Sequence, residues 1–447
     1  MSSIHIKNAR IINEGHDFRG DILIKDEYIV AVGNTDDIPI PHDALIINAE
    51  GLILIPGIID DHVHFRDPGL THKGDIHSES AAAVAGGVTS FMDMPNTKPQ
   101  TTTVSLLDEK FRTASEKSFA NYSFYIGATN TNIDEIMKAD PAHVCGIKLF
   151  MGASTGNMLV DEGNALRELF ANADIPVAAH CEDEGIIRKN SDLYREKYGN
   201  DVPVSMHPRI RSREACYTSS FHAVNLAREF NTRLHILHLS TADELKLFRN
   251  DIPLEDKRIT AEACVHHLWF EESAYETLGT LVKWNPAVKT AYDRNALQKA
   301  LNNDIIDVVA TDHAPHTLEE KKNTYFNAPS GGPFIQHSLQ AMLELWHRNI
   351  ISIAKITELM CHNPSRLFNI DKRGFIREGY KADLCLIDPS RPYTVTRDSI
   401  LYKCGWSPLE GTTFSTTIVK TIVNGTVVWD EGNINKDYRG QRLDFTR

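Results

Sequence analysis

The chain has 447 residues, of which 42% are hydrophobic and 24% charged, as in globular proteins with a large core. Its net charge of −13 repels nucleic acid and anionic membranes, so any positive charge that binds an anionic substrate has to be concentrated at one site. No stretch has the length and apolar character of a membrane span, and the first residues lack the pattern of a secretory signal. The seven cysteines are scattered, with no Cys-x-x-Cys pair, which favours a reducing, cytoplasmic location without disulfides.

Both ends of the chain are rich in short predicted strands. The first 54 residues contain five, at 3–6, 9–12, 20–25, 28–33 and 44–48. The C-terminal part contains strands at 382–388, 417–423 and 426–429, the last two joined by Asn424-Gly425. Asn-Gly between two alternating apolar runs is a strong hairpin signal. We expect residues 1–54 and 372–447 to meet as one small β-sandwich domain.

The middle of the chain alternates predicted strands and helices. The eight predicted strands are 55–65, 88–94, 122–128, 146–151, 177–181, 234–239, 259–265 and 308–312, with helical segments between most of them. Eight such units over residues 55–371 predict a (β/α)₈ TIM-like barrel, an α/β fold whose active site is built at the C-terminal strand ends. A doubly wound open sheet is the alternative. It is disfavoured because the first strand-to-helix turn carries no Gly-x-Gly-x-x-Gly.

The first predicted barrel strand ends in His62-Val63-His64-Phe65-Arg66. Because His62 and His64 are two residues apart on a strand, both imidazoles project from the same face, as half of a metal site would require. Arg66 is two residues beyond His64, so its side chain is expected on the same face, and its guanidinium suits a carboxylate. A surface strand with incidental histidines is the alternative, and further ligands at other strand ends argue against it.

Four other predicted strands end in candidate ligands. These are Lys148 in the fourth, His180 in the fifth, His238 in the sixth and Asp312 in the eighth. Lys148 either reaches the barrel rim or is buried, where its neutral amine could take up carbon dioxide and bridge two cations as a carbamate.

Six candidate ligands are too many for one ion and suit two divalent ions about 3.5–4 Å apart. Nitrogen and oxygen ligands without thiolate favour zinc, with cobalt or manganese as alternatives. His235 lies on the opposite face from His238, and we expect it and the pair His266-His267 to be structural.

Four motifs carry a resemblance to a known family. They are Pro-Gly-Ile-Ile-Asp-Asp-His-Val-His-Phe-Arg-Asp-Pro-Gly at 56–69, Met-Pro-Asn-Thr at 94–97, Thr-Asp-His-Ala-Pro-His at 311–316 and Asn-Pro-Ser at 363–365. In these motifs the chain resembles the cyclic amidohydrolases of the amidohydrolase superfamily, the dihydroorotases most closely. The resemblance implies the same barrel and a β-sandwich formed from both termini.

The resemblance also implies roles for single residues. His62 and His64 would bind one zinc ion, His180 and His238 the other, and N-carboxylated Lys148 would bridge them. Asp312 would bind metal and shuttle a proton. The substrate contacts would be Arg66, Asn96, Asn285 and His316. Many single-chain bacterial dihydroorotases with the first motif have an aspartate in place of the bridging lysine, so the segment around Lys148 resembles the lysine version shared by hydantoinases and other dihydroorotases.

The expected reaction is the reversible hydrolysis of L-dihydroorotate to N-carbamoyl-L-aspartate in pyrimidine biosynthesis, with attack by a bridging hydroxide. Allantoinase and dihydropyrimidinase are the enzymatic alternatives, and an inactive scaffold homologue is the alternative from another class. We expect a homo-oligomer that binds a small molecule, and neither nucleic acid nor a membrane. Whether the loop at 317–332 closes on substrate stays open.

Overall fold

The computed structural model describes residues 3–33, 41–152 and 158–447. Its centre is a parallel sheet of eight strands that are hydrogen-bonded in chain order: β6 (Ile58–Val63), β7 (Val88–Asp93), β8 (Asn121–Gly127), β9 (Gly146–Phe150), β10 (Val177–His180), β11 (Leu234–Ile236), β12 (Ile259–Cys264) and β13 (Val308–Ala310). A parallel bridge joins Val63 in β6 to His313, just beyond β13. The last strand therefore returns to the first, and the predicted eight-stranded barrel is confirmed.

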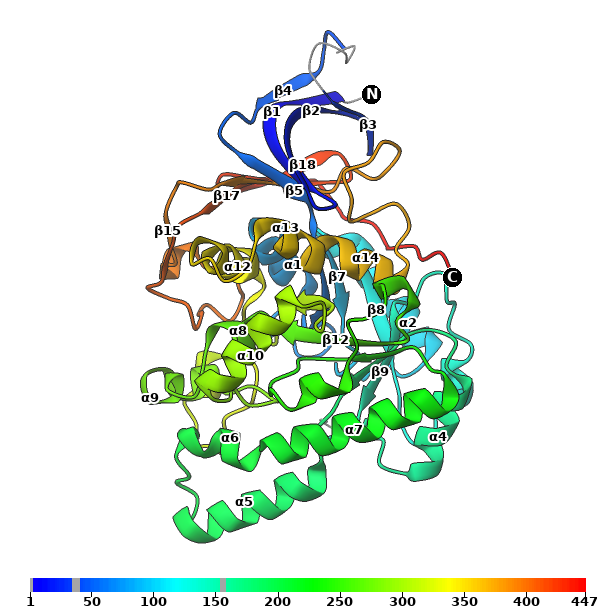
Figure 1. Cartoon of the computed structure of the whole chain (residues 1–447), viewed down its shortest axis with the longest axis vertical. Coiled ribbons are helices and arrows are strands. Elements are labelled where there is room, and N and C mark those ends of the chain that lie inside the picture. The colour runs from blue at the N-terminus through cyan, green and yellow to red at the C-terminus, as the bar shows by residue number, and fades with distance from the viewer. Residues whose placement is uncertain (1–2, 34–40, 153–157) are drawn as a thin grey trace.

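Helices cover the outside of the barrel (Figure 1). The longer ones are α1 (Ile76–Ala85), α2 (Val104–Lys117), α4 (Gly163–Asn172), α5 (Glu184–Tyr198), α7 (Arg213–Phe230), α10 (Ala291–Asn302) and α12 (Ser338–His347). The shorter ones are α3 (Ile133–Ile136), α6 (His207–Ile210), α8 (Val265–Trp269), α9 (Ala274–Leu278), α11 (Leu318–Lys321), α13 (Ile353–Thr357) and α14 (Asn363–Phe368). Side-chain oxygens of Asp75, Thr103 and Ser212 cap the first turns of α1, α2 and α7.

The barrel strands are buried on both faces because helices lie outside them and side chains fill the interior. Every residue of β7, β8 and β9 is buried, including Phe91, Phe124 and Ile147. A polar group inside such a core needs a partner. The buried histidines, carboxylates and lysine at the strand ends therefore form a distinct polar region within an apolar barrel.

The two ends of the chain form a second sheet of nine strands at the top of Figure 1. The N-terminal part supplies β1 (Ser3–Asn13), β2 (His16–Lys25), β3 (Tyr28–Gly33), β4 (Leu45–Asn48) and β5 (Ile53–Pro56). The C-terminal part supplies β14 (Leu384–Asp388), β17 (Thr417–Val423), β18 (Thr426–Asp430) and β19 (Asn433–Ile434). A small separate pair is formed by β15 (Tyr393–Thr394) and β16 (Thr413–Phe414).

Strand β5 joins the two ends, since it pairs with β1 on one side and β14 on the other. The sequence places Ile55–Pro56 in the first barrel strand, whereas the structure places them in this terminal sheet and begins the barrel at Ile58. Gly57 lies between the two strands. A Cβ atom on Gly57 would lie 2.1 Å from Oγ1 of Thr89, so the chain passes β7 at a distance that only glycine allows.

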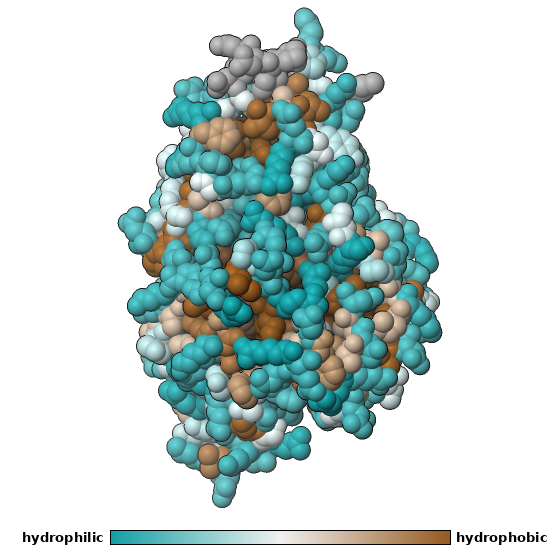
Figure 2. All heavy atoms as spheres, turned by 45° about the vertical axis from the view of Figure 1, so that its right-hand side comes forward, coloured by the Kyte–Doolittle hydropathy of each residue, from teal (hydrophilic) through white to brown (hydrophobic). Residues whose placement is uncertain are grey.

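The face shown in Figure 2 is mostly hydrophilic, with smaller areas of apolar residues between the polar ones. No helix within 3–33, 41–152 and 158–447 is long and apolar enough to cross a membrane. All seven cysteines are free thiols, and six of them are buried.

Candidate active site

A cavity of about 720 Å³ opens at the C-terminal ends of the barrel strands. All ten residues predicted from the sequence line it: His62, His64, Arg66, Asn96, Lys148, His180, His238, Asn285, Asp312 and His316. They come from strand ends and loops up to 254 positions apart in the chain, from 62 to 316. The barrel therefore brings together every candidate ligand and substrate contact.

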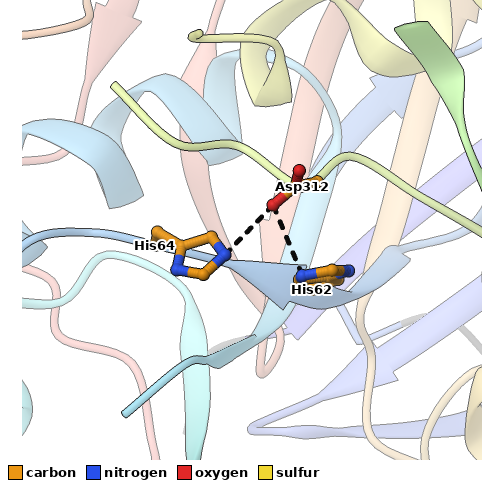
Figure 3. Close-up of side chains that lie close together, drawn as sticks. All are labelled: His62, His64 and Asp312. Atoms are coloured by element: carbon orange, nitrogen blue, oxygen red, sulfur yellow. Dashed lines mark ion pairs between the residues drawn. The ribbon is translucent and has the colours of Figure 1, made fainter. Parts of the chain in front are cut away.

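His62, His64 and Asp312 form the first group of candidate ligands (Figure 3). One carboxylate oxygen of Asp312 lies 3.3 Å from Nε2 of His62 and 3.0 Å from Nε2 of His64. Burial lowers the pKa of His64 to about 4, so its imidazole is neutral and able to donate a lone pair. Burial acts to raise the pKa of Asp312, but the neighbouring His62 and His64 outweigh it and keep the carboxyl ionised.

His180 and His238 form the second group. Nδ1 of His180 lies 2.9 Å from Nε2 of His238, and burial lowers the pKa of both residues. The ring of His238 is 5.2 Å from that of His62, so the two groups adjoin. Nδ1 of His238 is buried and has no hydrogen-bond partner among the described residues. Facing imidazole nitrogens and an unpartnered buried nitrogen fit bound metal cations.

Lys148 lies on β9, next to the strand that carries His180. Its side chain is fully buried and does not extend to the rim of the barrel. Its ammonium group lies 4.6 Å from the centre of the Phe150 ring. Within the part of the chain that the structure describes, no carboxylate lies within ion-pair distance of it. Burial lowers the pKa of this amine to about 8, which favours the neutral form compared with an exposed lysine.

Two buried glutamates that the sequence analysis did not identify support the histidines. Oε1 of Glu262 accepts hydrogen bonds from Nδ1 of His62 at 3.0 Å and from the backbone N–H of His238 at 2.8 Å. Glu182 lies 3.0 Å from Nε2 of His180 and also pairs with Arg211. Such contacts fix the tautomer and orientation of metal-ligating imidazoles. A glutamate inside the otherwise uncharged strand 259–264 was the signal that could have found Glu262.

The remaining predicted residues form the other wall of the cavity. Arg66 has a positive φ of 69° and donates to the carbonyl oxygen of Pro315, and its Nη2 lies 3.0 Å from Nε2 of His316. Asn96 accepts a hydrogen bond from Nδ1 of His64 at 2.7 Å, which links this wall to the first ligand group. The side-chain oxygen of Asn285 is buried and unpartnered among the described residues.

Arg66 is the buried cation of this wall. It is 7% exposed and has no carboxylate partner in the described segments, whereas the nearby Lys73 pairs with Glu320 at 2.8 Å. A buried, unneutralised guanidinium that borders a cavity is suited to binding a carboxylate of a ligand.

Residues 53–428 match the sequence model of the amidohydrolase family, and this match covers more than half of the chain. The chain belongs to the amidohydrolase family. Among curated relatives of this amidohydrolase, the dihydroorotase of Methanosarcina acetivorans is 32% identical over 460 residues, covering 99% of this chain and 96% of the relative. The dihydroorotase of Pyrococcus furiosus is 33% identical over 395 residues, covering 88% of this chain and 86% of the relative.

Solved structures similar to this amidohydrolase include the L-hydantoinase (dihydropyrimidinase) of Arthrobacter aurescens. It superposes with a TM-score of 0.91 at 27% identity, covering 97% of this chain and 98% of that one. The dihydropyrimidinase of Brevibacillus agri superposes with a TM-score of 0.87 at 22% identity, over 97% and 96% of the two chains, which supports the fold alone. The family and the barrel expected from the sequence motifs are thereby confirmed.

The loop at 317–332 forms part of the cavity wall of this amidohydrolase through Pro329, Ser330 and Gly331. Two buried lysines hold it in place. Nζ of Lys321 donates to the carbonyl oxygens of Pro329 and Gly331, at 3.0 and 2.7 Å. Nζ of Lys283 donates to those of Tyr325 and Ala328, both at 2.6 Å. Both lysines donate to backbone carbonyl oxygens and not to carboxylates. They therefore fix the path of the loop, and no acidic side chain of the described residues pairs with them.

Replacing Lys321 with methionine is expected to loosen this wall. Each buried carbonyl left without its donor costs about 1–3 kcal/mol, so the KM for substrate should rise on the order of tenfold, with the metal content unchanged. Steady-state kinetics and thermal unfolding measure the effect. Lys322→Met is the matched control, since Lys322 directly follows Lys321 in the chain and is exposed. Equal KM and melting temperature for both variants would show that Lys321 does not hold the loop.

Proposed function

We propose that this protein is a dihydroorotase, which reversibly hydrolyses the ring amide of L-dihydroorotate to N-carbamoyl-L-aspartate. The observation that carries the proposal is the placement of Arg66. Its buried guanidinium borders the same cavity as His62, His64 and Asp312 and is not neutralised by a carboxylate of the described chain. The dihydroorotases among the relatives support the same substrate.

The residues present fit two divalent cations, zinc best among them. His62, His64 and Asp312 would hold one ion, and His180 and His238 the other. When bound, such ions lower the pKa of a water molecule and polarise a carbonyl group, which is the hydrolytic chemistry this site needs. Glu262 and Glu182 would keep the imidazoles in their metal-binding orientation.

Lys148 would carry a carboxyl group formed from carbon dioxide, with one proton released as the amine nitrogen bonds to carbon. The resulting carbamate would be an anion, and the two histidine groups line the same cavity as Lys148. Three observations support this modification: Lys148 is buried, it has no acidic partner among the described residues, and it lines the cavity. A carbamate offers two oxygen atoms and thereby completes an oxygen- and nitrogen-rich ligand set.

The chain's own residues would then position the substrate and move one proton. Arg66 holds the substrate carboxylate through charge-assisted hydrogen bonds, with Asn96, Asn285 and His316 around the ring. As water adds to the ring carbonyl carbon, Asp312 accepts its proton. Asp312 then donates that proton to the ring nitrogen while the carbon–nitrogen bond breaks. The reverse sequence closes the ring.

A hydantoinase or dihydropyrimidinase activity is the second candidate, favoured by the close superposition with the Arthrobacter aurescens enzyme. Allantoinase shares the same chemistry. Rings that lack a carboxylate leave Arg66 without a partner, which is why we rank these activities lower. An inactive scaffold is disfavoured because all six candidate ligands are present at one cavity. The role in pyrimidine biosynthesis, a cytoplasmic location and a homo-oligomeric state stay predictions from the sequence.

Substrate comparison tests the proposal. We expect the zinc-loaded protein to hydrolyse dihydroorotate with a kcat/KM at least ~30-fold above that for dihydrouracil, because the carboxylate contact contributes about 2 kcal/mol or more. Hydantoin and allantoin should be equally poor substrates. Faster hydrolysis of any of these neutral rings than of dihydroorotate would contradict the assignment and leave only a cyclic amidohydrolase.

A further inference from the structure

A second, smaller pocket of about 260 Å³ opens at the opposite end of the barrel from the catalytic cavity. Arg233 and Arg258 line it, and each directly precedes a strand, β11 and β12 respectively. The candidate ligands His180 and His238 lie at or just beyond the far ends of β10 and β11. The pocket is therefore separate from the site of the proposed reaction, which in such barrels lies at the C-terminal strand ends.

Most charged groups around the pocket have partners of opposite sign. Lys257 pairs with Asp307 at 2.7 Å, and both side chains are almost completely buried. Arg366, from α14, pairs with Glu255 at 3.3 Å. His235, another residue of the pocket lining, faces the buried Asp61 at 3.2 Å. These charges are balanced within the protein.

Arg233 and Arg258 have no such partners. Arg233 donates to the carbonyl oxygen of Leu367, and Arg258 donates to that of Asn231 at 3.1 and 2.5 Å. No carboxylate of the described residues lies within ion-pair distance of either guanidinium. Burial and the nearby Arg258 both lower the pKa of Arg233, as expected for two cations that repel each other. A chain of net charge −13 thus places two positive charges without carboxylate partners, the half-buried Arg233 and the exposed Arg258, side by side on the wall of one small pocket.

We infer that this pocket binds a small phosphate-bearing anion between Arg233 and Arg258. Guanidinium groups match the geometry of phosphate oxygens through paired hydrogen bonds, and a dianion would neutralise both charges at once. The pocket is smaller than the roughly 300–1,000 Å³ of sites for drug-sized ligands, so inorganic phosphate or a compact phosphomonoester fits and a nucleotide does not. The bound anion would not be consumed. It would relieve the repulsion and stabilise this end of the barrel.

Thermal unfolding and calorimetry with inorganic phosphate, at ionic strength held constant with potassium chloride, test this inference. We expect phosphate at ten times its Kd, which adds about 1.4 kcal/mol of stability, to raise the Tm of the metal-loaded protein by about 1–2 °C. Glycerol 3-phosphate is titrated in parallel, and tighter binding of either compound identifies free phosphate or a phosphomonoester as the preferred ligand. The variants Arg258→Glu and Arg233→Met/Arg258→Met should lose this shift and retain only the general stabilising effect of phosphate as a salt.

Arg19→Met/Arg112→Met is the matched control, because it removes two exposed arginines outside the pocket and should respond as the unaltered protein does. Arg258→Glu keeps the inference testable if the double methionine variant does not fold, since the new carboxylate can pair with Arg233. Arg66→Met should keep the phosphate shift, and tungstate soaked into crystals should give an anomalous peak between Arg233 and Arg258. An unchanged shift in Arg258→Glu, its loss in Arg66→Met, or no shift in the unaltered protein would overturn the inference.

Discussion

Lys148→Ala is expected to lower kcat for dihydroorotate by about three orders of magnitude or more, equivalent to about 4 kcal/mol of transition-state stabilisation. The reason is that alanine removes the group proposed to carry the carbamate between His62/His64 and His180/His238. The metal content should fall in parallel. Steady-state kinetics and elemental analysis of the purified variant measure both quantities.

A small carboxylic acid provides the control for this prediction. Acetate or propionate can enter the space left by the lysine side chain and should restore part of the rate of Lys148→Ala. Lys148→Met fills the same space with an apolar chain of similar length, so it should be equally inactive and not respond to the acid. Substantial activity of Lys148→Ala without any added acid would contradict the bridging role.

Arg66→Met is expected to lower kcat/KM for dihydroorotate between about 30-fold and several thousand-fold, with metal content unchanged. This range corresponds to the roughly 2–5 kcal/mol lost when one partner of a buried charged pair is removed. The activity on dihydrouracil, which lacks the carboxylate, should change far less. Initial rates on both compounds give the comparison.

Lys98→Met is the matched control for Arg66, since Lys98 also lines the cavity but is exposed at its mouth. It should change kcat/KM for dihydroorotate by less than about fivefold, as expected for a solvent-screened cation. If Arg66→Met instead retained normal turnover of dihydroorotate, the carboxylate would bind elsewhere. Loss of metal in Arg66→Met would mean that this residue supports the ligands rather than the substrate.

The barrel and the groups at its strand ends follow from local sequence patterns. The alternation of strands and helices predicts eight parallel strands, and a parallel sheet collects all C-terminal strand ends on one side. Parity within one strand then places His62 and His64 on the same face. Because these rules act over a few residues, they can be applied to the sequence alone. They predict that Lys148, His180, His238 and Asp312 meet at one site, and all four line one cavity in the structure.

The supporting contacts could not be predicted in this way. Glu262 contacts His62 across 200 positions of sequence, and Arg66 contacts His316 across 250. Such pairs depend on side-chain rotamers across the closed barrel, which have no local signal, even though the lone charge in strand 259–264 marks the position of Glu262. The division at Gly57 was also missed, because the apolar run 52–59 is continuous although its two halves join different sheets.

The most direct test of the two-metal site and its substrate is a crystal structure with bound dihydroorotate and anomalous data at the zinc edge. We expect two anomalous peaks, one beside His62 and His64 and one beside His180 and His238, with the density of Lys148 extended by a carboxyl group between them. The dihydroorotate carboxylate should lie within hydrogen-bond distance of Arg66. A fully active protein whose crystals show no metal at these histidines, or a substrate carboxylate remote from Arg66, would contradict the proposed site.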